Sequence, residues 1–337
     1  MLDAFFHAIR FFQILCGGFT CLLIWRLGLR LFTPAIAVSA AFAAAVYGPL
    51  IFFDGEVLPA TFGTFLGLTG LILMLHAIER PGPLRFFIAG VVFGLAALTI
   101  ATILTFAAAA AIFIWTRCKA RHIPAIQRLR DPGFFLIGVA LTIAPVTVRN
   151  IVVGEDRVLI SSNAGVNFYV GNSGDYEEKV NIRPGWEWDE LLERPRLDHG
   201  ITKASKKSTF FFAEAWEYMS SEPWEYAVLL ARKMLLFWQG DEIGRNQGIY
   251  FWRNYSAVLS VTLWKRLGLA FPFGIAAPLA LLGCALAIRR QGFSLPLLFI
   301  AIYCLSVVAF FITSRYRIPL IPLLLLYASY GAHWLVA

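Results

Sequence analysis

Charged residues are scarce in this chain of 337 residues: 15% are Asp, Glu, Lys or Arg, whereas 59% are hydrophobic. A water-soluble domain of this length is far more polar, so that class of protein is excluded. The five cysteines form no CxxC pair and the five histidines form no HxxxH pair, so neither a disulfide framework nor a common zinc motif is predicted. The sequence also lacks a P-loop and the GxGxxG, GxSxG, HExxH and nucleic-acid-binding motifs.

Long apolar runs are abundant instead. A run of 18 or more such residues can cross about 30 Å of hydrocarbon as a helix. The hydropathy pattern predicts an all-α polytopic membrane protein with about nine transmembrane helices. These spans cover approximately residues 11–32, 34–53, 57–77, 84–100, 102–117, 134–152, 268–288, 294–313 and 317–335.

A long polar segment separates the sixth and seventh predicted spans. It divides the chain into an N-terminal bundle (1–153), an external insert (154–266) and a C-terminal bundle (267–337). Apolar and polar residues alternate over 155–176, with Gly and Asn between them, which predicts one or two strands in a small mixed α/β insert. The stretch near 222–239 predicts a helix with Trp at both ends. Such a helix suits the membrane interface, although packing on the core of the insert is the alternative.

Basic residues gather in the loops on one side of the predicted bundle. This side holds Arg26, Arg30, Arg80, Arg85, the segment 116–131, Arg289 and Arg290. By the positive-inside rule it is the cytoplasmic side, so the insert and the N-terminus lie outside. An external N-terminus without a preceding span is unusual. The sequence therefore predicts either that residues 1–12 lie along the outer interface or that a further span precedes them.

Asp54 and Glu56 lie in the short external loop FFDGEVLP. A carboxylate beside hydrocarbon is costly unless it is paired or solvated, so such acids tend to be functional. Two acids separated by one glycine could bind a divalent metal or a sugar, or supply a general base. Both are candidate catalytic residues. The alternative is that they are solvated loop acids that help to end the span.

Arg315 and Arg317 lie in TSRYRIP, on the same external side. Positive charges in short external loops run against the inside bias. The planar guanidinium matches phosphate, so both arginines are candidate phosphate-binding residues, together with Arg149 at the end of the sixth span. The alternative for each of them is a headgroup contact of the kind that arginines commonly make at span ends.

Amide and aromatic residues follow the sixth span. Amides hydrogen-bond hydroxyl groups, and aromatic rings cover the apolar faces of sugars, so Asn163, Asn167 and Tyr169 are candidate substrate-binding residues. Tyr316, between the two arginines, is a fourth. Ordinary turn chemistry with strand aromatics is the alternative for the segment that holds the first three.

Several stretches resemble, in order, the bacterial GT-C glycosyltransferases, relatives of protein O-mannosyltransferases and lipid A aminoarabinose transferases. Residues 12–32 resemble an early span that ends in basic residues, and residues 46–73 resemble a span–loop–span around an acidic loop. Residues 90–110 resemble a pair of short helices. The most specific likeness is 142–173, where a span ending in P-x-x-x-R-N leads into an Asn- and Gly-containing segment. The stretches 232–246 and 314–324 complete the series.

This resemblance implies a multi-pass enzyme of the bacterial inner membrane. It would move a sugar from a polyprenyl-phosphate donor to a lipid, glycan or protein acceptor on the periplasmic face. Arg315 and Arg317 would hold the carrier phosphate, while Asp54, which matches an acid in the family's second external loop, would deprotonate the acceptor. The resemblance implies no certain cofactor, leaves a divalent metal open and gives no nucleic-acid partner.

The family also has an acid in its first external loop. The first clear span here resembles a later span of the family, so the resemblance implies that this chain lacks the family's first span and first catalytic loop. Two other functions stay open: a truncated, non-catalytic lipid-binding protein or partner subunit on the same scaffold, and a transporter or flippase. The span interiors carry almost no charge, which weighs against transport.

Overall fold

The computed structural model describes residues 2–120, 124–244, 248–266 and 268–336. Within them, five helical segments are long and apolar enough to cross a membrane alone. They are α1 (Leu2–Leu31), α4 (Ala60–Glu79), α7 (Ala125–Val152), α15 (Phe273–Gln291) and the segment Ser314–Val336, which comprises α17 (Ser314–Arg317), η2 (Ile318–Leu320) and α18 (Ile321–Val336).

A sixth span is bent. The helices α2 (Pro34–Ala45) and α3 (Gly48–Gly55) meet at 51°, where Pro49 falls in the first turn of α3. Three shorter apolar helices complete the bundle: α5 (Pro83–Thr99), α6 (Ile103–Ala120) and α16 (Leu295–Ala309). Each predicted span thus corresponds to a helix, and the chain is an all-α polytopic membrane protein. The helix of the sixth predicted span extends beyond the apolar run 134–152, because α7 begins at Ala125 with a polar, basic turn.

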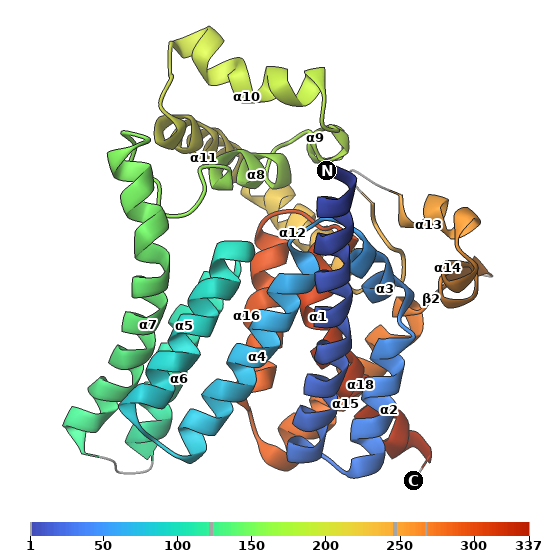
Figure 1. Cartoon of the computed structure of the whole chain (residues 1–337). Helices are drawn as coiled ribbons and strands as arrows, with labels where there is room; N and C mark the ends of the chain where they lie inside the picture. Colours follow the sequence, from blue (N-terminus) through green and yellow to red (C-terminus); the bar gives the residue numbers. More distant parts are fainter. Residues whose placement is uncertain (1, 121–123, 245–247, 267, 337) are drawn as a thin grey trace.

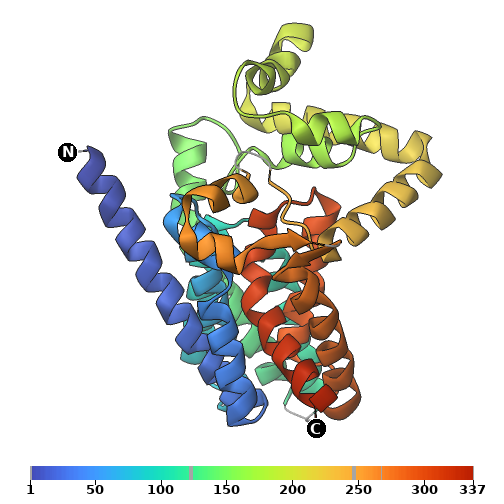
Figure 2. The same cartoon turned by 90° about the vertical axis from the view of Figure 1, so that its right-hand side faces the viewer.

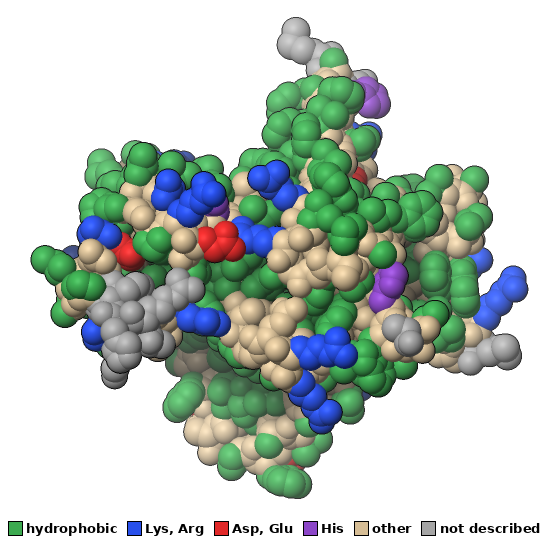
Figure 3. Space-filling model, turned by 90° about the horizontal axis from the view of Figure 1, so that it is seen from below, with side chains coloured by type: hydrophobic (Ala, Val, Ile, Leu, Met, Phe, Trp, Pro, Cys, Tyr) green, Lys and Arg blue, Asp and Glu red, His purple; other side chains and the backbone are tan. Residues whose placement is uncertain are grey.

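The spans run up and down between two ends of the molecule (Figure 1). The N-terminus and the insert lie at one end and the C-terminus lies at the other, as the alternation of predicted spans requires. In Figure 2, α1 leans away from the rest of the bundle toward its N-terminus. The end opposite the insert carries more Lys and Arg side chains than Asp and Glu side chains (Figure 3). We call these two ends the insert face and the basic face.

Small residues allow close helix contacts in the bundle. A Cβ atom on Gly90 of α5 would lie 2.0 Å from the Phe135 carbonyl oxygen of α7, and one on Gly283 of α15 would lie 1.9 Å from the Tyr327 oxygen of α18. Backbones that approach so closely gain van der Waals contact, which drives helix association in lipid. The first of these helix pairs lies within the N-terminal half of the bundle and the second within the C-terminal half.

The insert is mostly helical. Its elements are α8 (Ala164–Gly171), α9 (Tyr176–Asn181), α10 (Trp186–His199), α11 (Ala204–Ser221), α12 (Pro223–Trp238), α13 (Ile249–Trp252), η1 (Arg253–Tyr255), α14 (Ala257–Thr262) and the antiparallel hairpin β1 (Trp264–Arg266) and β2 (Leu269–Phe271). The hairpin continues the insert beyond residue 266, and α15 begins at Phe273.

The strands predicted for 155–176 are wrong. This stretch folds into α8, which packs on α11 with Gly165 so close that a Cβ atom there would lie 2.1 Å from the Ser208 oxygen. Val166, Tyr169 and Val170 are buried on one face at helical spacing. The alternation of apolar and polar residues in this stretch therefore does not correspond to the alternating buried and exposed positions of a strand. The helix expected near 222–239 is present as α12.

Candidate functional site

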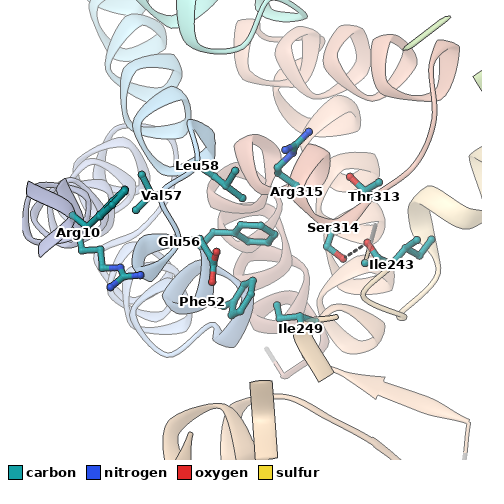
Figure 4. Close-up of a pocket in the computed structure, with 13 residues that line it drawn as sticks. Arg10, Phe52, Glu56, Val57, Leu58, Ile243, Ile249, Thr313, Ser314 and Arg315 are labelled. Carbon is teal, nitrogen blue, oxygen red and sulfur yellow. Dashed lines mark hydrogen bonds between the residues drawn. The ribbon is translucent and has the colours of Figure 1, made fainter. Parts of the chain in front are cut away.

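A cavity of about 460 Å³ opens between the two halves of the bundle on the insert face. One wall comes from α1, α3 and the α3–α4 loop, and the other from the segment that leads into α17 (Figure 4). The segment after α12, at Ile243 and Gly244, completes the lining of the cavity. The lining residues are Phe6, Arg10, Phe52, Phe53, Glu56, Val57, Leu58, Ile243, Gly244, Ile249, Thr313, Ser314 and Arg315.

Glu56 supplies the carboxylate of this cavity. It follows the last residue of α3 in extended conformation, so the side chain leaves the helix and reaches the opening. The loop is held by α1, because Gln13 Nε2 donates to the Leu58 oxygen at 2.7 Å and Arg10 Nε donates to the Gly55 oxygen at 3.1 Å. The position of Glu56 is therefore fixed from both sides of the loop.

Arg315 supplies a cation on the opposite wall. It is half-buried on the short helix α17, and its Nη2 donates to the Tyr316 hydroxyl at 3.0 Å, with the guanidinium 4.9 Å from the ring centroid. In Figure 4 the guanidinium points away from the Glu56 carboxylate. The two opposite charges share a cavity without an ion pair between them, which leaves space for a ligand that contacts both.

Thr313 and Ser314 line the same wall. Ser314 is anchored, because its backbone N donates to the Ile243 oxygen at 2.8 Å. The Thr313 hydroxyl oxygen is buried and has no hydrogen-bond partner among the described residues. A buried polar atom without a partner is costly, and a ligand hydroxyl or phosphate oxygen would satisfy it.

Arg317 does not line the cavity, contrary to the expectation of two neighbouring phosphate ligands. Its side chain is buried and donates to the backbone oxygens of Phe237, Gln239 and Asp241 and to Glu242 Oε2 at 2.9 Å. The guanidinium also lies 4.2 Å from the Phe273 ring centroid. Arg317, two residues after Arg315, therefore links the start of the last span to the end of α12 and the segment that follows it.

Asp54 lies apart from Glu56. It lines a second cavity of about 400 Å³, between α1, α3 and α4, together with Gly17 and Thr61. Thr61 Oγ1 donates to Asp54 Oδ1 at 2.8 Å. The two acids expected to act together thus open into different cavities. Among the described residues no group of three or more His, Cys, Asp or Glu side chains is placed to hold a metal ion.

The remaining candidates lie elsewhere on the insert face. Arg149 is exposed at the end of α7, where its Nη1 is 3.4 Å from Asn150 Oδ1. Asn163 lines a separate open cavity of about 640 Å³ beyond α7, and Asn167 lies on α8. Tyr169 is buried in the core of the insert, and its hydroxyl accepts a hydrogen bond from Arg194 Nη1 at 3.2 Å. Tyr316 lies beside the cavity through its contact with Arg315.

Arg10 was missed by the sequence reading. It lines the cavity near the N-terminus of α1, on the same wall as Glu56 (Figure 4). The signal was present, because a cation at the insert-side end of a span runs against the inside bias in the same way as Arg315. The residue was passed over because its helix was expected to begin only at residue 11.

A second missed group is Lys233, which joins the insert to the cavity wall. It is fully buried on α12, and its Nζ donates to the Gly171 oxygen (2.9 Å), Asn172 Oδ1 (2.9 Å) and the Phe310 oxygen (3.0 Å). Asn172 in turn donates to the Ala309 oxygen at 2.8 Å. Burial lowers the pKa of Lys233 to about 7. These bonds fix the segment that runs from α16 to Thr313.

One comparison with known proteins gives a match. Residues 3–148 match the family described as dolichyl-phosphate-mannose-protein mannosyltransferase, over less than half of the chain. The matched part runs from α1 into α7 and includes Arg10, Asp54 and Glu56. No curated protein and no solved structure matches the chain. The family match supports a GT-C-like glycosyltransferase, the class that the sequence resembles.

Proposed function

We propose that the protein is an integral-membrane glycosyltransferase that takes a sugar from a polyprenyl-phosphate donor at the insert face. The single observation that carries the proposal is the shared cavity of Glu56 and Arg315, on a chain whose residues 3–148 match a mannosyltransferase family. A volume of about 460 Å³ falls within the range of small-molecule sites. The cavity lies at the ends of the spans, where a lipid-linked phosphate meets the membrane surface.

In the proposed reaction, the Glu56 carboxylate accepts the proton of an acceptor hydroxyl. The acceptor oxygen then forms a bond with the anomeric carbon of the sugar. The bond from that carbon to the phosphate oxygen breaks, and the carrier phosphate leaves with the bonding electrons. General-base help of this kind is worth about 10²–10⁴-fold in rate. The leaving group is already anionic, so fixed cations near it lower the barrier as its charge grows.

Arg315 is the proposed contact for the leaving phosphate. Its guanidinium is half-buried and donates one side-chain hydrogen bond within the described residues, to the Tyr316 hydroxyl, and its planar fork of donors matches a phosphate. Thr313, whose hydroxyl finds no hydrogen-bond partner among the residues that the structure describes, is a proposed contact for the donor. Arg317 is a positioning residue in this scheme, since its donors are engaged by the backbone around residues 237–241 and by Glu242.

Asp54 takes a supporting role in the proposal. Its hydrogen bond to Thr61 spans the α3–α4 loop that carries Glu56, so it holds the ends of that loop together. Arg149, Asn163 and Asn167 lie on the same face and are proposed for the acceptor side. We assign Tyr169 to the core of the insert and not to the substrate, because its ring and hydroxyl are enclosed.

The proposed orientation places the insert face outside, in a bacterium on the periplasmic side of the inner membrane. It rests on the excess of Lys and Arg on the basic face (Figure 3). The apolar side chains that α12 leaves exposed, Trp224, Val228 and Leu235, fit a helix at the outer interface.

The direct test is transfer by the purified full chain in lipid, with a set of radiolabelled polyprenyl-phosphate sugars and a membrane extract as the source of acceptors. We expect release of polyprenyl phosphate together with a labelled product. Arg315→Ala should lower transfer about 10²–10³-fold without loss of folded protein. The matched control is Arg183→Ala, which removes an exposed arginine of the insert outside the cavity. Donor binding without any transfer would favour the alternative, a non-catalytic lipid-binding protein.

A further inference from the structure

The end of the insert carries an apolar face that nothing in the described part of the chain covers. In the segment of α13, η1 and α14, Ile249, Leu259 and the residue directly after α14, Leu263, are buried against the bundle. Those on the outward side are exposed: Phe251 by 57%, Tyr255 by 73%, Val258 by 51% and Val261 by 72%. A chain segment in water would not present such a contiguous apolar strip without a partner.

This strip lies beside the membrane-spanning helices at the level of their insert-side ends. Figures 1 and 2 show α13 and α14 on the flank of the bundle, next to α3. The contact with α3 is close, because a Cβ atom on Gly48 would lie 2.7 Å from Thr262 Oγ1. The hairpin then leads directly into α15, a membrane-spanning helix. The strip is therefore continuous with the lipid-facing surface, where Trp and Tyr side chains commonly gather.

A small hollow of about 250 Å³ lies within this segment. Its walls are Arg253, Ser260, Val261, Trp264 and Arg266. The Trp264 ring stacks on Phe271 of the facing strand, with centroids 5.0 Å apart, so the hairpin wall of the hollow is fixed. The hollow shares no lining residue with the cavity of Glu56 and Arg315.

The charge of the segment has one sign. Residues 248–266 contain three cations, Arg253, Lys265 and Arg266, and no Asp or Glu. Lys265 is paired with Asp241 at 2.8 Å. Within the described ranges, neither Arg253 nor Arg266 has an ion pair or a side-chain hydrogen bond. Two guanidinium groups thus line one hollow, and no acidic side chain among the described residues pairs with either of them.

We infer that this hollow binds the phosphate headgroup of an anionic phospholipid, whose acyl chains lie along the strip of Phe251, Tyr255, Val258 and Val261. Two arginines present planar forks of donors to the phosphate oxygens. The apolar strip gives the acyl chains a surface at the depth where they begin. A free anion would use only the first of these features, whereas a phospholipid uses both. The inference stands independently of the proposed transferase activity.

A lipid at this place would fix the end of the insert against the bundle. The same segment carries Ile249, which lines the transferase cavity from the other side. Each arginine near an anionic surface contributes enough to change lipid affinity about fivefold. Removing both should therefore weaken phospholipid retention by an order of magnitude or more, while a zwitterionic lipid should be little affected.

The test uses the full chain purified in detergent, with phosphatidylglycerol and phosphatidylcholine as probes. Native mass spectrometry counts the retained lipids, and a thermal melt gives the shift in Tm on addition of each lipid. We expect the wild type to retain phosphatidylglycerol preferentially and to gain Tm with it. The double variant Arg253→Ala/Arg266→Ala should lose both effects, Arg253→Lys/Arg266→Lys should keep part of them, and the control Arg183→Ala should keep them in full.

Three results would overturn the inference. The wild type could retain both lipids equally, which would leave only non-specific contact with headgroups. The alanine double variant could keep the wild-type preference, which would place the lipid elsewhere. Inorganic phosphate could raise Tm as much as phosphatidylglycerol, which would define a site for a free anion. If the alanine double variant does not fold, the comparison of lipids and phosphate on the wild type and the lysine double variant still decides among these results.

Discussion

Arg317 and Glu242 form a buried ion pair, with Nη2 of the arginine 2.9 Å from Oε2 of the acid and only 1% and 3% of the two side chains exposed. The pair links the start of the last span to the segment after α12, which lines the cavity at Ile243. Arg315 lies two residues earlier, half-buried, on the cavity wall. Two arginines of identical chemistry in one short motif thus have different environments, and their removal should have different consequences.

Arg317→Ala should destabilise the protein strongly. It leaves the Glu242 carboxylate buried without its cation and frees three backbone oxygens, and loss of one partner of such a pair costs about 3–5 kcal/mol. Arg315→Ala should change stability by less than about 1 kcal/mol, because it is half-buried and makes one side-chain hydrogen bond. Thermal unfolding of the two variants in the same detergent measures the difference. Equal losses of stability would show that Arg317 is not the tether described here.

Glu56→Gln and Asp54→Asn should separate the two acids of the FFDGEVLP loop. If Glu56 is the base, its amide variant should lose about 10²–10⁴-fold in transfer rate with little change in donor affinity. Asp54→Asn keeps the shape of the side chain and can still accept from Thr61, so a loss below about tenfold is expected. The measurement is the single-turnover rate of sugar transfer at saturating donor for the wild type and for each of the two variants. A full loss in Asp54→Asn with an active Glu56→Gln would return the catalytic role to Asp54.

Much of the fold could be predicted from the sequence because the relevant signals are local. Hydropathy gave each of the helical spans in order, and Pro223 in the first turn marked the start of α12. The insert was harder to predict. The segment 155–176 alternates like a strand, but α8 is stabilised by its contact with α11, more than thirty residues away along the chain. No local pattern contains that contact.

The candidate site likewise has residues that could be predicted from local sequence and features that could not. Glu56 and Arg315 could be found because both charges stand beside apolar spans on one face. The separation of Glu56 from Asp54 could not be found, since it depends on where α1 packs. The burial of Arg317 depends on the backbone oxygens of residues 237–241, and the burial of Lys233 depends on residues 171, 172 and 310. Charges that are satisfied by distant backbone look identical in sequence to charges that line a cavity.

Lys233 should give the stability of the protein a distinct dependence on pH. Burial lowers its folded pKa from the usual 10.5 to about 7, so between these values the unfolded state binds the proton more tightly than the folded state. Stability should therefore rise with pH across this window. Below pH 7 the lysine is protonated in both states and contributes no slope.

The variant Lys233→Met removes this titration. Melting curves from about pH 6 to about pH 10 should show a Tm difference between wild type and variant that changes in favour of the wild type as pH rises. The exposed Lys206→Met on α11 is the matched control, and its difference from the wild type should stay constant. A constant difference for Lys233→Met as well would mean that the three oxygens around Nζ hold the lysine charged throughout.

Gly17→Ala should disturb the packing of α1 on the carboxylate of Asp54. A Cβ atom at Gly17 would lie 2.0 Å from Asp54 Oδ2, whereas one at the neighbouring Gly18 would meet nothing within 4 Å. Since Thr61 holds the carboxylate, the clash should cost about 1–3 kcal/mol. Gly18→Ala should be neutral or slightly stabilising, because alanine is the better helix former.

A double-mutant cycle tests whether the carboxylate is the cause. In the background Asp54→Ala the oxygen that meets the new Cβ atom is gone, so Gly17→Ala should become nearly neutral there. The coupling between the two sites should then equal most of the cost of the single change, measured as free energies of unfolding in one detergent. If the two costs simply add, α1 does not rest on Asp54, and the second cavity is not closed by the contact that the structure shows.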